Sequence, residues 1–167
     1  MTDPTGPDAS SRPAEPAKSS GTRGGSRAPL TSARSKARRE ALDILFEAEQ
    51  RGFNALDMLD ERTQRPAREN PPRPFAAEIV RGVAAHWGAV NDLISTYSQG
   101  WSLERLPAVD RAALRLGIWE VLYHDDTPDA VAVSEAVALV AALSTDDSPA
   151  FVNGLLSRIV QEKPTLV

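Results

Sequence analysis

Apolar residues recur every three or four positions through almost the whole chain after Leu30. This spacing places them on one face of an α-helix, as in the buried stripe of a helical bundle. No segment shows the alternation of apolar and polar residues that is typical of a half-buried strand. The sequence therefore predicts an all-α fold of about seven helices. The short links between them favour antiparallel neighbours in two packed helical bundles.

Capping and turn-forming residues predict where these helices begin and end. Thr31 or Ser32 can cap a first helix that runs to Arg51 and stops at Gly52. Asn54 can cap a short second helix. A long third helix is expected to carry Trp87 in its buried stripe, and its Gly82 and Gly88 could allow helices to cross closely. The third helix spans 75–98, and the remaining predicted segments are a short turn over 103–106 and helices over 107–124, 132–143 and 148–161.

Composition predicts how the chain is organised. The first 30 residues are rich in Pro, Gly, Ser, Thr and Ala, and between Met1 and Leu30 they contain no large apolar residue. Such a segment buries too little surface to offset the entropy of ordering, so a disordered basic tail is expected. A loop rich in proline and arginine and the later Gly100 divide the rest of the chain. The predicted parts are a tail, 1–30, and one helical domain, 31–163, with a three-helix lobe, 31–100, and a four-helix lobe, 101–163.

The residue types argue against an enzyme or a metalloprotein. There is no cysteine, and the two histidines, His86 and His124, lie far apart in the sequence. A disulfide framework, a thiolate zinc site and a cysteine nucleophile are therefore excluded. We expect no catalytic residue, metal site or cofactor. No apolar run approaches the roughly 20 residues that cross a bilayer, so a cytoplasmic protein with no membrane partner is expected.

Charge is distributed unevenly along the chain. The net charge is −4, yet residues 1–39 hold eight bases and three acids, a net of +5, and residues 40–167 hold 11 bases and 20 acids, a net of −9. Four bases fall in the first turns of the first helix, where the helix dipole disfavours cations. An anionic ligand would offset that cost, and a solvated charged helix start is the alternative. These bases are Arg34, Lys36, Arg38 and Arg39.

The start of the last helix is unusual. Ser148 can be its N-cap and Pro149 its first helical residue. Asn153 and Gly154 come within the next two turns, although both are poor helix formers. Either this segment packs very closely against a neighbouring helix or it presents its backbone and amide to a ligand.

Four blocks, in this order and spacing, resemble the NusB antitermination factors. They cover most of residues 34–160, and the last contains the family's F-V-N-G signature. The blocks are SKAR with ALDILF (35–46), VDRAALRLGIWE (109–120), PDAVAVSEAVAL (128–139) and FVNGLL (151–156).

The resemblance implies an all-helical protein that acts in transcription antitermination without enzymatic activity or cofactor. Its partners would be single-stranded boxA RNA of ribosomal RNA leaders, the small-subunit ribosomal protein NusE and the transcription elongation complex. Formation of a homodimer stays open.

The resemblance also implies a site. An RNA surface would combine the basic start of the first helix with the turn before the last helix, and Asp110 would face NusE. Phe46 stands where the family has a tyrosine, so it could stack but not donate a hydrogen bond. The implied RNA-binding residues are Arg34, Lys36, Arg38, Arg39, Phe46, Asp147, Phe151 and Asn153.

Simpler interpretations compete with this site. Asp147 could serve only the helix dipole, and Phe151 is better explained as core. The whole chain could instead be a helical protein–protein adapter, or a regulatory lobe like the NusB-like domain of ribosomal RNA methyltransferases. It carries no Gly-rich nucleotide-binding loop and no cysteine, so it cannot itself be the methyltransferase.

Overall fold

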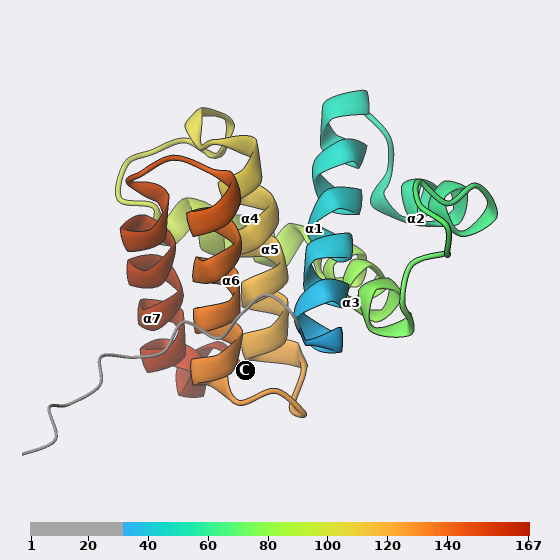
Figure 1. The fold of residues 1–167 in the computed structure, drawn as a ribbon. Helices are drawn as coiled ribbons and strands as arrows, with labels where there is room; N and C mark the ends of the chain where they lie inside the picture. Colours follow the sequence, from blue (N-terminus) through green and yellow to red (C-terminus); the bar gives the residue numbers. More distant parts are fainter. Residues whose placement is uncertain (1–31) are drawn as a thin grey trace, which may run out of the picture.

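The structure, a computed structural model, describes residues 32–167, and the predicted tail lies outside this range. The described residues form seven α-helices and one short 3-10 helix, with no strand among them, which confirms the all-α prediction (Figure 1). The elements are α1 (Ala33–Arg51), α2 (Ala55–Gln64), α3 (Pro74–Ala85), α4 (Trp87–Tyr97), η1 (Leu103–Arg105), α5 (Ala108–Tyr123), α6 (Asp129–Leu143) and α7 (Ser148–Leu166).

The first helix begins and ends, and the second helix begins, where their capping residues predict. The Ser32 hydroxyl accepts a hydrogen bond from the Ser35 backbone N–H at 3.0 Å. Gly52 adopts a left-handed conformation with φ 68°, which ends α1 at little steric cost because glycine has no Cβ. The Asn54 side chain accepts from the Leu56 N–H at 2.8 Å and caps α2.

Helix α1 lies between the two groups of helices. It packs against α2 and α3 on one side and against α5 on the other (Figure 1). Helices α5, α6 and α7 follow one another as antiparallel neighbours. All residues of α5 from 112 to 120 are buried, so this helix forms the centre of the core.

One predicted close crossing is present and the other is absent. A Cβ added at Gly82 would lie 2.0 Å from the Trp119 indole nitrogen, so α3 can approach α5 only because residue 82 has no side chain. A Cβ added at Gly88 would have no atom within 4 Å. Gly82 therefore has the predicted packing role, and Gly88 does not.

The long helix predicted over 75–98 is wrong as a single element. It breaks at His86, which has φ −115° and ψ 23° and stacks on Tyr123 with 3.7 Å between ring centroids. The break redirects α4 against α5 and α7. Trp87, predicted to be core, is 38% exposed, and the Arg115 guanidinium lies 4.3 Å from its ring centroid.

Helix α7 also differs from its prediction. Asp147 takes the N-cap position without a side-chain hydrogen bond, and Ser148 is already helical. The helix continues beyond residue 161 to Leu166 and contains Pro164. Within the described range, no helix is long and apolar enough to span a membrane.

Candidate nucleic-acid interface

The predicted RNA-binding residues lie at two ends of the molecule rather than in one site. Arg38 near the start of α1 pairs with Glu120 near the end of α5. Glu49 near the end of α1 pairs with Arg111 near the start of α5, so α1 and α5 run antiparallel. Asp110, near the start of α5, bonds to Ser148 at the start of α7. The starts of α1 and α7 are therefore at opposite ends of the bundle (Figure 1). The 16 residues of α5 correspond to roughly 24 Å.

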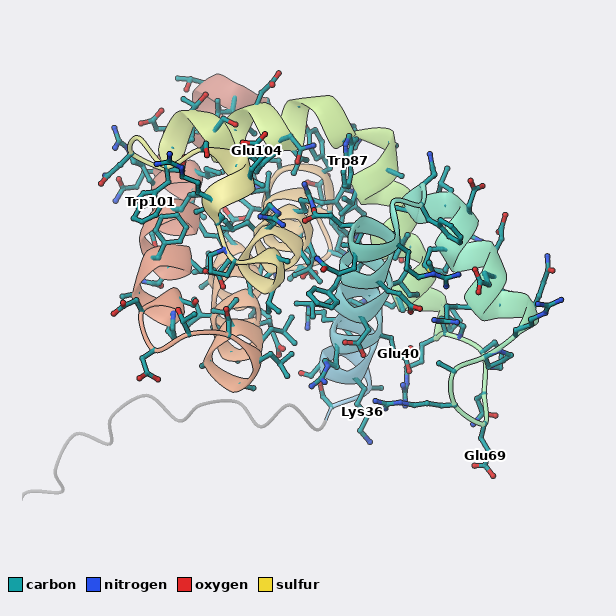
Figure 2. The ribbon with its side chains drawn as sticks, turned by 90° about the horizontal axis from the view of Figure 1, so that it is seen from above. Lys36, Glu40, Glu69, Trp87, Trp101 and Glu104 are labelled. Carbon is teal, nitrogen blue, oxygen red and sulfur yellow. The ribbon has the colours of Figure 1, made fainter. Side chains whose placement is uncertain are left out.

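The start of α1 presents exposed cations. Arg34 and Lys36 are exposed, and Figure 2 shows Lys36 at the start of α1. No described carboxylate forms an ion pair with either side chain. Arg39 is partly exposed and pairs with Asp43 one turn further along, at 3.2 Å. Since such exposed pairs are weak, Arg39 remains available to an anion.

Arg38 is buried and serves packing in place of the predicted RNA contact. Its residue is 2% exposed. The guanidinium donates through Nε and Nη2 to the two carboxylate oxygens of Glu120, each at 2.8 Å, and lies 3.6 Å from Glu135. Thr127 donates a further hydrogen bond to Glu120 at 3.1 Å. The charge of Arg38 thus holds α1 against α5 and α6.

Ser35 completes this buried network. Its hydroxyl donates to a Glu135 carboxylate oxygen at 2.8 Å. Sequence analysis missed Glu120 and Glu135 as partners of α1 because they lie 82 and 100 positions away from Arg38 and Ser35. The one signal in the sequence was the position of Arg38 within the apolar stripe of the first helix, which indicates a buried partner.

A groove borders the basic end. It encloses about 770 Å³ between α1 and the loop that follows α2. Carboxylates of α1 and arginines near the loop face each other across it, and the Arg73 backbone N–H donates to Glu40 at 2.8 Å. Because the groove is lined by carboxylates as well as arginines, it does not extend the cationic surface.

Phe46 lies midway along α1 and packs partly buried against the core. Phe151 of α7 has the same environment, in agreement with its interpretation as core. Neither ring is a free platform at the start of α1.

The start of α7 exposes the other predicted polar residues. Asp147 and Asn153 are exposed, and Gly154 is exposed beside them. A Cβ added at Gly154 would meet no atom within 4 Å. Close helix packing therefore does not explain Asn153 and Gly154, and both lie on an open surface.

Asp110, expected to face a protein partner, is 2% exposed. Ser144 donates to one of its carboxylate oxygens at 2.7 Å, and Ser148 donates to the other at 2.9 Å. The carboxylate thus fixes the turn between α6 and α7. This placement corrects the expectation that Asp110 contacts NusE directly, because the side chain is buried and both of its carboxylate oxygens accept hydrogen bonds within the protein.

A second ionic cluster joins α1 to α5 near the opposite end. Glu49 accepts hydrogen bonds from Arg111 and Arg115, and Arg115 also donates to Asn91 at 2.9 Å. Burial by itself raises the pKa of Glu49, but the two guanidinium groups outweigh it and hold the pKa below its ordinary value. Burial lowers the pKa of Arg115, which its bonds to Glu49 partly oppose.

Among residues 32–167, no group of three or more His, Asp or Glu side chains is placed to hold a metal ion. The arrangement is suited to noncovalent contacts: two exposed cations, a third that is weakly paired, and a buried network that fixes the helix carrying them.

The family model and the relatives given below assign this helical architecture to the transcription antitermination factors, a non-catalytic class of protein. The chain belongs to the NusB family, whose model matches residues 35–161.

The alignments with named relatives cover nearly the whole length of each relative. The chain is 57% identical over 136 residues to the transcription antitermination protein NusB of Arthrobacter sp. (strain FB24), which covers 81% of this chain and 98% of that protein. It is 56% identical over 135 residues to the NusB protein of Nocardioides sp. (strain ATCC BAA-499 / JS614), with coverage of 81% and 98%.

Solved structures share the fold. T. maritima NusB is 33% identical and superimposes with a TM-score of 0.69, covering 78% of this chain and 92% of that one. A structure described as antitermination factors NusB and NusE in complex with dsRNA is 27% identical, with a TM-score of 0.65 and coverage of 75% and 93%.

Proposed function

We propose that this protein binds the single-stranded boxA element of nascent ribosomal RNA together with NusE, in the cytoplasm, and so supports antitermination by the elongating transcription complex. The observation that carries the RNA contact is the exposure of Arg34 and Lys36 at the start of α1. Cations at this position are unfavourable for the helix alone, and phosphates would offset that cost. The relative solved with NusE and RNA supports the choice of partners.

The buried residues contribute indirectly. Arg38 fixes the helix that carries the exposed cations. Asp110 shapes the α6–α7 turn, and the exposed Asp147 in that turn and Asn153 in the second turn of α7 form the proposed second contact. A carboxylate there would accept from a base amino group, since it cannot favour a phosphate.

A titration of labelled boxA RNA, with and without NusE and at several salt concentrations, tests this function. The wild-type protein with NusE should bind boxA more tightly than a scrambled RNA of equal length. Arg34→Ala and Lys36→Ala should each make the negative slope of log affinity against log salt less steep by about 0.7, the value for one phosphate of a single strand. Arg105→Ala is the matched control, since Arg105 is an exposed arginine of η1, away from the start of α1.

Equal affinity for boxA and scrambled RNA would refute recognition of boxA. Binding to NusE without any RNA binding would support the protein–protein adapter instead.

A further inference from the structure

Arg34 is held against an aromatic ring of another helix. Its guanidinium carbon lies 4.4 Å from the centroid of Phe75, the second residue of α3. Arg34 is exposed, whereas Phe75 is half-buried and packs against the core. At this distance the cation is attracted by the ring quadrupole, so the guanidinium has a preferred position.

Phe75 is itself held in place from within the core. Its ring lies 5.5 Å from the ring of His124, measured between centroids, and His124 stacks on Trp119 at 4.9 Å. The Arg38 guanidinium lies 5.4 Å from the same ring. Glu120 holds Arg38 in place, so the Phe75 ring packs against fixed, buried neighbours.

A guanidinium supported in this way is suited to stacking. Its delocalised plane stacks on aromatic faces, and unpaired bases of a single strand are read largely by stacking on aromatic rings or arginine planes. Holding the plane in advance also reduces the entropy that the side chain would lose on binding.

We infer that Arg34 and Phe75 form a stacking platform for one unpaired RNA base, with Arg34 as the contact and Phe75 as its positioning residue. This inference rests on the proposed RNA-binding function. It adds a base contact to a surface that charge alone would assign to phosphates.

An abasic scan of the RNA tests the platform directly. Each nucleotide of the boxA oligonucleotide is replaced in turn by an abasic one, and binding is measured for wild type, Arg34→Lys and Phe75→Leu. At one position the abasic change should weaken wild-type binding by about five- to tenfold, the size of one cation–π contact. Both variants should lose most of that sensitivity, because lysine cannot stack as a plane and leucine cannot support the guanidinium.

Affinity and salt dependence measured together separate a loss of stacking from a loss of charge. Arg34→Lys and Phe75→Leu both keep the positive charge, so their salt slopes should equal the wild-type slope while affinity falls. Thermal unfolding of Phe75→Leu checks the fold. Arg34→Lys changes an exposed side chain and leaves the core intact.

The chain provides a matched control pair at the other end of α1. The Arg51 guanidinium lies 4.4 Å from the Phe53 ring, the same distance as between Arg34 and Phe75. Phe53→Leu should leave both RNA affinity and the abasic profile unchanged.

The results divide cleanly. If wild type binds boxA but no abasic position couples to Arg34 or Phe75, the platform is refuted and the proposed function stands. If wild type does not bind RNA, both are refuted. Equal losses in Phe75→Leu and Phe53→Leu would also refute the platform.

Discussion

Arg38 and Arg39 are neighbours in the sequence and differ completely in environment. Arg38 is enclosed by Glu120 and Glu135, while Arg39 forms one partly exposed pair with Asp43. Removing one member of a buried ionic group leaves the others without compensation, whereas an exposed pair contributes little. At the scale of single residues, this difference predicts a large loss of stability for one substitution and almost none for its neighbour.

We expect Arg38→Met to reduce the free energy of unfolding by about 3–5 kcal/mol, because two buried carboxylates lose their cation. Arg39→Ala, the matched control, should change it by less than about 0.5 kcal/mol. Urea unfolding of both variants measures the difference. Similar, small losses in the two variants would contradict the buried network.

The Glu49 cluster predicts a dependence on pH. Glu49→Gln should reduce the free energy of unfolding by about 2 kcal/mol at neutral pH. This loss is smaller than for a fully buried pair, because Arg115 keeps its hydrogen bond to Asn91. The pKa of Glu49 is lowered by folding, so its contribution is complete above the ordinary value of 4.5. That contribution is lost as the pH falls through the lower pKa of the folded state.

Unfolding measured between pH 7 and pH 3 should therefore show the two proteins converging on the acid side. A constant difference across this range would contradict the assignment to the Glu49 carboxylate.

Residue type and position predicted the exposure of some charged side chains and not of others. Arg34 and Lys36 are on the surface as expected, but Arg38 and Asp110 are buried. A charged side chain is usually exposed unless it has a partner, and the partner here belongs to another helix. The spacing of residues along one helix therefore carries no information about a partner on another helix. Phe75 was missed as a site residue for the same reason, since it meets Arg34 only through the packing of α3 on α1.

Among the elements, the contact between α3 and α5 depends on one missing side chain. We expect Gly82→Ala to destabilise the protein by about 1–3 kcal/mol, because the new Cβ would overlap the Trp119 ring. Gly88→Ala should stabilise it by up to about 1 kcal/mol, since it adds a better helix former where space is open. Thermal unfolding of the two variants should show shifts of opposite sign.

Two downward shifts of equal size would show that both positions are equally packed and would contradict the observed geometry.

Local signals predicted the helix ends better than the helix break. Ser32, Gly52 and Asn54 act through hydrogen bonds or backbone conformation within a few residues, so the sequence alone reveals them. The break at His86 leaves the apolar spacing intact on both sides, with buried Val83 before it and Val90 after it. The stacking of His86 on Tyr123 comes from another helix, and periodicity cannot detect it.

For the whole molecule, the two groups of predicted RNA-binding residues are separated by the length of the bundle. At about 3.4 Å per nucleotide, the per-strand rise of a duplex, a fully stacked strand needs about seven nucleotides to span the roughly 24 Å of α5. Lys36→Ala should weaken binding of both short and long RNAs that contain the boxA core. Asn153→Ala and Asp147→Asn should weaken only RNAs longer than about seven nucleotides.

Binding measured for a length series of oligonucleotides tests this arrangement, and Arg105→Ala again serves as the control. Equal sensitivity of the shortest RNA to changes at both ends would contradict it.

The antiparallel order of the helices also returns the chain to the end where α1 begins. Lys163 of α7 lies 3.0 Å from Asp129 at the start of α6, and Figure 1 shows the C-terminus at the end of the bundle that carries the first turn of α1. A dye attached to Val167 would therefore report on ligands arriving at the cationic end. The same dye attached at residue 146 would report on the distant end, so one chain offers two spatially separate optical probes.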